Sequence, residues 1–451
     1  MEKLFGTDGI RGMANKYPVT PEMALAVGKA VAHFFKNENE KTSIIIGKDT
    51  RISGSMLENA LASGACSRGA DIYCAGIIPT PGVAVLTKTT KSIAGIMISA
   101  SHNPYYDNGI KIFNKNGIKL SDDQEKKIEK LISDNYFLAE NENYHKIGSV
   151  VDISLEGKKQ YINFLLKTFD NLCNFKKIKI IVDCANGATS TVAAELFEKF
   201  GFNFKIIFNK FDGKNINQNC GSQHPEKLRQ KVLEQKADIG LAFDGDGDRL
   251  IVVDEKGNIL TGDHILAVLA NHLKQNGKLS NNTVVSTVMS NIGLTMALKA
   301  MGIDHIKTDV GDRNVLSEML KQKSIIGGED SGHIILLDHH VTGDGILCAL
   351  MLIQIMQKQA KLLSELTNVI TIYPQVLINV KVEKKPPMET LKRIAAEKKS
   401  IEKKLGKQGR VLIRYSGTQP LIRIMVEGPT IDDTQKYCRQ LAEIVKQELC
   451  K

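Results

Sequence analysis

The chain has 451 residues, 42% of them hydrophobic and 24% charged, which predicts about three globular domains of ordinary soluble composition. No apolar run approaches the roughly 20 residues that cross a bilayer, and the first five residues are not a signal peptide. The formal charge is +10, and many of the lysines lie in mixed-sign runs such as residues 393–404, which indicates solvated helices. Small anionic molecules are therefore favoured as partners over nucleic acid or a membrane.

The eight cysteines are scattered along the chain, and no two of them form a CxxC pair. Several lie within apolar segments, as reduced thiols in a protein core do. We therefore expect free thiols and a cytoplasmic location. Both a monomer and a homodimer stay open.

Three segments of the chain repeat one pattern: an apolar strand, a polar loop, a helix, a glycine and a second strand. They run from strand 43–46 to strand 71–73, from 178–182 to 204–207, and from 283–287 to 304–306, with the first helix expected near 56–68. Gly69, Gly201 and Gly302 are predicted to follow the helices in the left-handed conformation. This order predicts parallel or mixed sheets covered by helices, with functional loops at the ends of the strands.

The chain after about residue 366 has another pattern. We expect a strand over 375–382, a charged helix after Pro387, strands near 411–414 and 421–426, and a closing helix over 431–448. The fold class is therefore α/β, with three mixed α/β domains of similar topology and a C-terminal α+β domain. The predicted limits are 1–150, 151–253, 254–366 and 367–451.

The first candidate functional loop, the serine loop, is Ser99–Pro104, between the apolar run Ile93–Ile98 and a short strand expected over Ile110–Phe113. A displayed serine can act as a nucleophile when a base or a metal assists it. No GxSxG elbow surrounds Ser101, which argues against an acyl hydrolase. A plain serine–asparagine turn is the commoner explanation of such a stretch alone. A phosphorylated serine would offer further oxygen ligands to Mg²⁺.

The second, the aspartate loop, is Asp244–Arg249, and it has aspartates at alternate positions separated by two glycines. Three like charges this close destabilise a fold unless a cation lies among them, and Mg²⁺ is the first candidate for oxygen ligands. The flanks, Ala237–Phe243 and Leu250–Val253, are predicted strands. A calcium EF-hand is excluded because its sixth position needs glycine, where this chain has Arg249.

Two further loops have side chains suited to sugar phosphates. In the glycine–glutamate loop, Gly327–His333, Glu329 and Ser331 can bind hydroxyls and His333 can transfer protons near neutral pH. A polar surface turn explains this stretch equally well. In the arginine loop, Arg414–Arg423, two arginines and two hydroxyl side chains surround a glycine, a combination suited to binding phosphate.

Taken in this order after the opening segment Leu4–Gly12, the four loops resemble the α-D-phosphohexomutase family over the whole chain. The opening segment and Val310–Arg313 are most similar to its phosphoglucosamine branch. The resemblance implies a heart-shaped, four-domain isomerase whose last domain binds phosphate. It would interconvert glucosamine 6-phosphate and glucosamine 1-phosphate, through a phosphoserine and a sugar bisphosphate, on the way to UDP-N-acetylglucosamine.

The resemblance also implies a role for each matching residue. Ser101 would carry the phosphoryl group, and one Mg²⁺ per chain would be bound by a phosphoserine oxygen at Ser101 and by Asp244, Asp246 and Asp248. Proton transfer near the reacting oxygen would involve Arg11, Lys111 and His333. The substrate-binding residues would be Arg249, Glu329 and Ser331, with Arg414, Ser416, Gly417, Thr418 and Arg423 for the phosphate that is not transferred.

The chain departs from the family pattern at three positions. In the arginine loop, Tyr415 replaces a proline and Gln419 a glutamate, while Asp330 stands where the phosphoglucosamine branch commonly has glutamine. A phosphomannomutase or phosphoglucomutase therefore stays open as an alternative. A metal-dependent sugar phosphatase is a further alternative, and it would release inorganic phosphate steadily. A basic nucleic-acid-binding protein would leave the aspartate loop unexplained.

Overall fold

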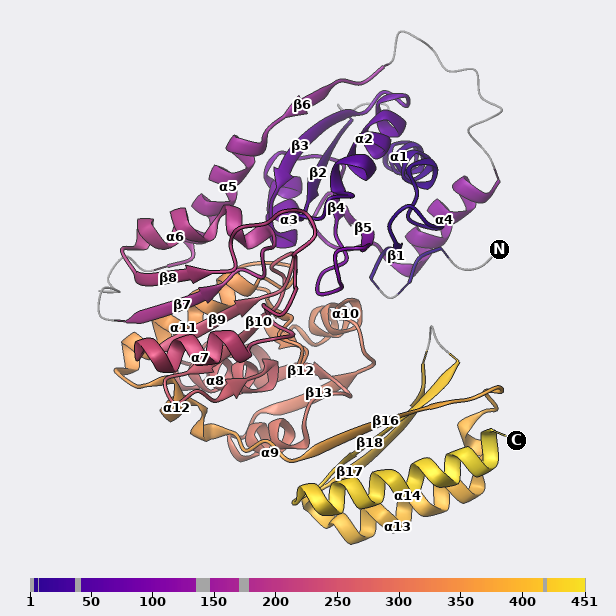
Figure 1. Cartoon of the computed structure of the whole chain (residues 1–451), viewed down its shortest axis with the longest axis vertical. Coiled ribbons are helices and arrows are strands. Elements are labelled where there is room, and N and C mark those ends of the chain that lie inside the picture. The colour runs from indigo at the N-terminus through magenta and orange to yellow at the C-terminus, as the bar shows by residue number, and fades with distance from the viewer. Residues whose placement is uncertain are drawn as a thin grey trace. The chain divides into compact units, whose positions relative to one another are not determined.

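The computed structural model describes residues 4–6, 8–36, 42–134, 147–169, 178–416 and 420–450. By its internal contacts the chain divides into two compact units, residues 1–288 with 306–367, and residues 289–305 with 368–451. The described residues form four sheets (Figure 1).

The first sheet has six strands in the order β1-β5-β4-β2-β3-β6. Its strands are β1 (Ile10–Met13), β2 (Ser43–Lys48), β3 (Asp71–Ile77), β4 (Ala94–Ile98), β5 (Asp107–Asn114) and β6 (Val150–Asp152). Its helices are α1 (Pro21–Phe35), α2 (Gly54–Cys66), α3 (Thr80–Thr89), α4 (Asp122–Ser133) and α5 (Ser154–Lys167). Alternate side chains of β2, Ile44 and Ile46, enter a core shared with α1, α2 and α4. β4 is buried along its whole length, as expected of a strand covered on both faces.

The second sheet has the order β11-β10-β9-β7-β8. Its strands are β7 (Lys179–Asp183), β8 (Asn203–Ile207), β9 (Ile239–Phe243), β10 (Leu250–Asp254) and β11 (Ile259–Leu260). Its helices are α6 (Ala193–Phe200) and α7 (Glu226–Gln235). β7 is parallel to β8 and β9, whereas β9 and β10 are antiparallel. The aspartate loop is therefore the connection between two adjacent, fully buried strands.

The third sheet has the order β13-β12-β14-β15. Its strands are β12 (Thr283–Thr287), β13 (Asp304–Thr308), β14 (Ile326–Gly328) and β15 (Ile334–Leu336). The helices of this part of the chain are α8 (Gly262–Gln275), α9 (Ile292–Ala300), α10 (Asp312–Gln322), α11 (Gly345–Gln359) and α12 (Leu363–Leu366). β14 and β15 are antiparallel, and the glycine–glutamate loop joins them. No single helix within the described ranges is long and apolar enough to cross a membrane, although α11 taken together with residues 363–369 passes that test as a bent pair.

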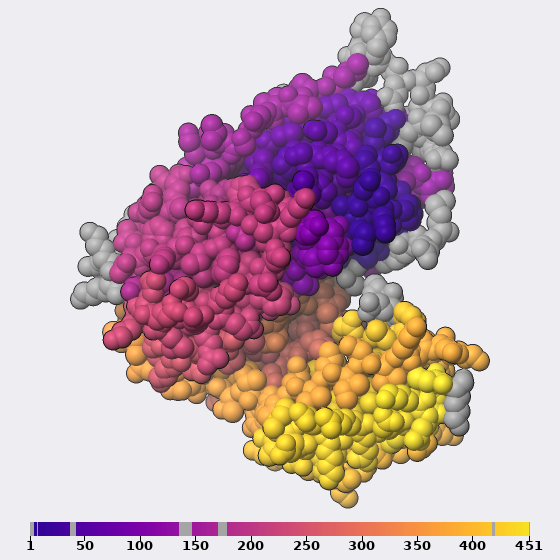
Figure 2. All heavy atoms as spheres, in the orientation of Figure 1, coloured from indigo at the N-terminus to yellow at the C-terminus, as the bar shows by residue number. Residues whose placement is uncertain are grey.

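The second unit contains an antiparallel sheet in the order β16-β18-β17. Its elements are β16 (Gln375–Lys381), α13 (Lys392–Leu405), β17 (Arg410–Tyr415), β18 (Leu421–Glu427) and α14 (Ile431–Leu449). Both helices lie on one face of the sheet (Figure 1), and the yellow atoms of α14 are visible on the surface of this unit in Figure 2. Their side chains share a core with alternate strand residues such as Val380, Ile422 and Ile424. The arginine loop joins β17 to β18.

The predicted glycine positions are confirmed, since Gly69, Gly201 and Gly302 have φ values of 84°, 69° and 66°. The first helix, expected near 56–68, instead spans Gly54–Cys66. The difference arises because the chain makes one more turn after the helix, in which the Gly69 amide donates to the Cys66 carbonyl. Short 3₁₀ helices occur at Ala188–Thr191, Ser280–Asn282, Thr367–Val369, Met388–Thr390 and Gly406–Gln408.

Candidate active site

The serine loop connects β4 to β5 and holds its serine in an uncommon conformation. Ser101 has a φ of 54°, in the left-handed region that non-glycine residues rarely adopt, and its side chain is buried. The backbone amide of Ser101 donates to the Ser99 hydroxyl over 2.8 Å. Such a conformation persists only when surrounding groups hold it, so the loop is a constrained part of the site.

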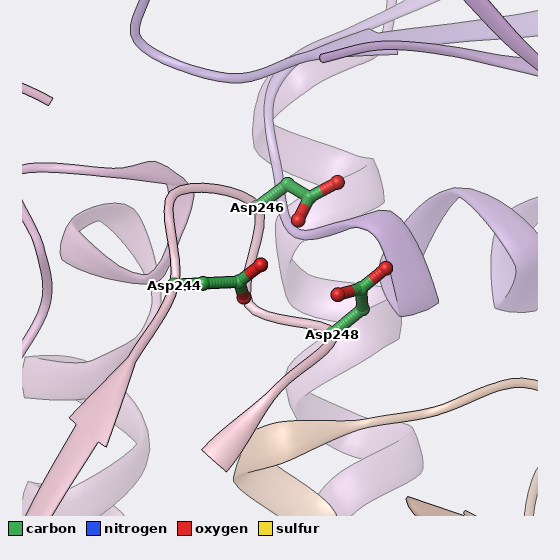
Figure 3. A group of neighbouring side chains, drawn as sticks. All are labelled: Asp244, Asp246 and Asp248. Carbon is green, nitrogen blue, oxygen red and sulfur yellow. The ribbon is translucent and has the colours of Figure 1, made fainter. Parts of the chain in front are cut away.

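The three carboxylates of the aspartate loop converge on one point (Figure 3). All three side chains are buried, and each of Asp244, Asp246 and Asp248 offers an oxygen within 4.8 Å of the others. Gly247 has a φ of 72°, which lets the loop turn sharply between the second and third aspartates. Thr80, the first residue of α3, donates its hydroxyl to Asp246 Oδ2 over 2.6 Å and so fixes that carboxylate.

The serine loop and the aspartate loop meet directly. The Ser101 hydroxyl donates to Asp244 Oδ2 over 2.5 Å. A Cβ atom at position 245 would lie 2.6 Å from the Ser101 carbonyl oxygen, so only glycine permits this close approach. Two loops that are 143 residues apart in the sequence therefore bring a hydroxyl and three carboxylates into one site.

The carboxylate cluster fits a hard divalent cation. Asp246 Oδ1 and Asp248 Oδ1 are buried and, among the described residues, have no hydrogen-bond partner. Burial first, and then the charges of Asp248 and Asp246, raise the pKa of Asp244 well above its usual value. A cation bound among the three oxygens would relieve this repulsion and satisfy the two oxygens without partners.

Lys111 compensates part of the negative charge. Its ammonium group, buried on β5, lies 2.7 Å from Asp246 Oδ2, 3.0 Å from Asp248 Oδ2 and 3.4 Å from Asp8 Oδ2. Burial lowers the pKa of Lys111, but the three carboxylates outweigh it and hold the pKa well above its usual value. Arg11 forms an ion pair with Asp8, so the opening segment contributes a second cation.

His333 lies on the other side of the cluster. Its Nδ1 is 3.7 Å from Asp248 Oδ1, and its Nε2 accepts a hydrogen bond from the Gly343 amide over 3.2 Å. A Cβ atom at position 343 would lie 2.6 Å from the imidazole ring, so this glycine allows the backbone to approach the ring. Burial lowers the pKa of His333, but Asp248 and Asp312 together outweigh burial and the pKa is raised. The imidazole is thus oriented next to the carboxylate cluster.

The glycine–glutamate loop presents polar groups that can bind hydroxyls. Glu329 Oε1 accepts from the Gly311 amide over 3.1 Å, which fixes the carboxylate. The Ser331 hydroxyl is buried and has no hydrogen-bond partner within the described part of the chain. Arg249 is anchored by its backbone amide, which donates to Asp244 Oδ1 over 3.1 Å.

The second unit holds the arginine loop. Arg414 of β17 lies directly opposite Arg423 of β18, so both guanidinium groups occupy one sheet face. Two like charges in register suit an anionic ligand between them. Ser416 is buried, and Lys385 Nζ donates to its carbonyl over 2.6 Å. Gly417, Thr418 and Gln419 lie outside the described residues.

Tyr415, one of the departures from the family pattern, has a visible role. Its hydroxyl donates to the Pro386 carbonyl over 2.8 Å, which ties the start of the arginine loop to the segment after β16. A side chain thus anchors the loop where a proline would restrict it by its ring.

Several residues close to the site were not predicted from the sequence. Asp8 and Lys119 form an ion pair beside Lys111, and Arg51 and Asn217 contact the backbone of the serine loop. Arg51 lies in a loop directly after a predicted strand, a position that often carries function, but no motif distinguished it. No sequence pattern marked Asn217, because its contact with the serine loop depends on the packing of two segments that are distant in the sequence.

The chain matches the phosphoglucomutase/phosphomannomutase family in four successive parts. The alpha/beta/alpha domains I, II and III match residues 2–139, 159–257 and 261–373, and the C-terminal domain matches residues 377–444. With the four observed sheets, these matches confirm the predicted class of three α/β domains and a C-terminal α+β domain.

The chain is also similar to curated proteins along its whole length. It is 53% identical over 449 residues to the phosphoglucosamine mutase of Syntrophus aciditrophicus and 49% identical over 452 residues to that of Clostridium kluyveri, covering 100% of both chains in each case. A family protein of Burkholderia thailandensis superposes with a TM-score of 0.81 at 24% identity, covering 99% of this chain and 98% of that one.

A more distant solved structure is an Aspergillus fumigatus N-acetylphosphoglucosamine mutase in complex with GlcNAc-6P and magnesium. Its TM-score is 0.69 at 17% identity, over 98% of this chain and 95% of that one. At these identities the two solved structures show a shared fold.

Proposed function

The chain belongs to the phosphoglucomutase/phosphomannomutase family, and on this premise we propose that it interconverts glucosamine 6-phosphate and glucosamine 1-phosphate. It is an isomerase of the phosphohexomutase type. The identity of 47–53% to phosphoglucosamine mutases over the full chain supports the choice of amino sugar. We place the reaction on the route to UDP-N-acetylglucosamine.

The observation that carries this proposal is the 2.5 Å contact between the Ser101 hydroxyl and Asp244 within the carboxylate cluster. We assign Ser101 as the residue that carries the phosphoryl group. A protein catalyses phosphoryl transfer mainly by aligning the reacting groups and by placing positive charge near the transferred phosphoryl group. Mg²⁺, held by Asp244, Asp246 and Asp248 with an oxygen of phosphorylated Ser101, would supply Lewis-acid stabilisation of the phosphoryl oxygens.

The proposed cycle has two transfers. In the first, the bond between Ser101 Oγ and phosphorus breaks while the free sugar hydroxyl bonds to the phosphorus. The hydroxyl loses its proton and the departing Ser101 oxygen gains one, which gives a sugar bisphosphate and a free serine. The bisphosphate reorients in the site, and in the second transfer Ser101 recovers the other phosphoryl group. We assign the proton movements near the reacting oxygen to Arg11, Lys111 and His333, which all surround the carboxylate cluster or its partner Asp8.

The substrate is proposed to be held at both ends. Arg249, Glu329 and Ser331 would bind the sugar side, since these groups are polar, anchored and, for Ser331, without a protein partner among the described residues. Arg414, Arg423 and Ser416 would bind the phosphate that is not transferred, because the two guanidinium groups lie opposite each other. Gly417 and Thr418 keep the same assignment from the sequence.

We further propose a cytoplasmic location, because the seven cysteines among the described residues are all free thiols. Both a monomer and a homodimer stay open. The domain limits at residues 150, 253 and 366 stay as proposed from the sequence.

The test is turnover of glucosamine, glucose and mannose 6-phosphates, each with Mg²⁺ and a catalytic amount of sugar 1,6-bisphosphate. We expect the highest kcat/KM with glucosamine 6-phosphate and no net release of inorganic phosphate. A preference for glucose or mannose would favour the phosphoglucomutase/phosphomannomutase alternative, which Asp330 in the glycine–glutamate loop keeps open. Stoichiometric phosphate release would indicate a phosphatase.

A further inference from the structure

The conformation of Ser101 needs an external support. Its left-handed backbone, with a φ of 54°, lies in a region that residues other than glycine disfavour. The serine loop must therefore be held by groups outside it, and those groups determine where the Ser101 hydroxyl points.

Arg51 is the principal support. It follows β2, and its side chain is buried with no measurable exposure. Its two terminal nitrogens donate to four carbonyls of the serine loop and the residues after it: Ser101 (3.0 Å), Asn103 (2.8 Å), Asp107 (2.9 Å) and Pro104. Its Nε donates to Asp49 Oδ2 over 2.9 Å. All five N–H groups of the guanidinium are thus used within the protein.

Asp49 extends this support to the other side of Ser101. Asp49 Oδ2 also accepts from the Ser99 hydroxyl over 2.6 Å, and the Ser99 hydroxyl accepts from the Ser101 amide over 2.8 Å. The Asp49–Arg51 pair therefore holds Ser101 by its carbonyl directly and by its amide through Ser99. The side-chain Nδ2 of Asn217 donates further hydrogen bonds to the Ser101 and Asn103 carbonyls, over 2.9 and 3.1 Å.

We propose that Arg51, oriented by Asp49, is a positioning residue that sets the alignment of Ser101 for phosphoryl transfer. Because its N–H groups are already used, Arg51 has none left to bind a phosphate and acts only through the serine loop. The planar guanidinium group of Arg51 is essential, because a lysine at this position has three N–H donors and cannot reach four carbonyls and a carboxylate together. This inference rests on the proposed function, in which Ser101 carries the phosphoryl group.

The test is the Arg51→Lys variant, measured as the single-turnover rate of phosphoryl transfer from phosphorylated Ser101 to the sugar phosphate. Misplacing a reacting group by about 1 Å lowers rates by about 100-fold, so we expect a loss of about that size. KM for the sugar phosphate should stay within about threefold of wild type, because the residues assigned to bind it are not altered. A transfer rate within threefold of wild type in folded protein would overturn the proposal.

The matched control is Arg410→Lys. Arg410 forms a similar ion pair with the buried Glu427 and donates to a backbone carbonyl, that of Ser290, but it lies at the opposite end of β17 from Arg414. It should lower thermal stability as Arg51→Lys does and leave the transfer rate unchanged. An equal loss of transfer rate in both variants would show that Arg51 is merely structural.

A second variant covers the case in which Arg51→Lys does not fold. Ser99→Ala removes only the hydroxyl that joins Asp49 to the Ser101 amide, and we expect about a tenfold slower transfer with KM unchanged. Unchanged transfer in Ser99→Ala would contradict the proposed chain of contacts. The proposed function fails separately, if wild-type protein with phosphorylated Ser101 does not transfer its phosphoryl group to any hexose phosphate.

Discussion

Asp344 allows a quantitative prediction of how stability depends on pH. This buried residue caps α11, with Oδ1 accepting from the Leu347 amide and Oδ2 accepting from the Tyr161 hydroxyl, each over 3.0 Å. Burial raises the pKa of Asp344 to about 7, and its hydrogen bonds offset only part of that effect. In the unfolded chain the pKa of an aspartate is about 3.9.

The sign follows from the proton count. Between these two pKa values the folded protein binds a proton at Asp344 that the unfolded chain has released, so the free energy of unfolding falls as pH rises. The ratio of the binding polynomial of Asp344 in the unfolded chain to that in the folded protein, each taken relative to the protonated form, grows from about 10 at pH 5 to about 1,000 at pH 8. This change corresponds to a loss of about 2.5 kcal/mol in the free energy of unfolding. Below about pH 4 both states are protonated, and the destabilisation is absent.

Asp344→Asn should remove this pH dependence. The amide oxygen can still accept from Leu347, and the amide nitrogen can donate to Tyr161, so the helix cap is retained. We expect the variant to gain about 2.5 kcal/mol over wild type between pH 5 and pH 8, measured by urea unfolding at each pH. Asp123→Asn, at a side chain that is 88% exposed, serves as the control and should show a constant difference. A constant difference for Asp344→Asn as well would refute the raised pKa.

Three further predictions concern the proposed chemistry. Ser101→Ala should lower kcat by at least about 1,000-fold with little change in melting temperature, because it removes the phosphoryl carrier; near-normal turnover would remove that assignment. Asp246→Asn should weaken Mg²⁺ binding about tenfold or more, seen by calorimetry, since it takes one carboxylate from the cluster; an unchanged titration would contradict the metal site. Arg414→Ala should raise KM for the sugar phosphate about tenfold with a smaller effect on stability, whereas an unchanged KM would exclude its role in phosphate binding.

The sequence predicted the elements whose signals are local. Buried strands such as β9 and β10 are continuous apolar runs, and the glycines at 69, 201 and 302 follow helices in the left-handed conformation that a non-glycine residue disfavours. The aspartate loop was recognised because three aspartates within six consecutive residues repel one another unless a cation lies among them. Such features do not depend on how distant segments pack.

The parts that the sequence did not predict depend on distant contacts. Arg51 resembles any arginine after a strand, and only the fold brings it to carbonyls 50 to 56 residues away. Asn217 contacts a carbonyl 116 residues away, and nothing in its own segment signals this. The resemblance to a family identified the groups proposed for catalysis but not the buried groups that hold them in place.

The ionisable groups around the carboxylate cluster form a closed ring in which acidic and basic side chains alternate. Its members, in order of contact, are Asp248, Lys111, Asp8, Lys119, Asp312 and His333, and His333 returns to Asp248. The contacts range from 2.5 Å, between Lys119 and both its partners, to 3.7 Å between His333 and Asp248. The ring draws its members from all three α/β segments of the chain.

Buried ions lose their hydration, and each one is tolerated only while its partners remain in place. Burial raises the pKa values of Asp8 and Asp312. Lys111, Lys119 and Arg11 outweigh burial at Asp8, and Lys119 with His333 outweighs it at Asp312, so both pKa values lie below their usual range. Displacing any one segment would leave at least one buried charge with half its partners, which is far costlier than a small loss of apolar contact. The ring therefore ties the relative placement of the three α/β segments to the geometry of the carboxylate cluster, so that the fold of this unit and its chemistry depend on the same ion pairs.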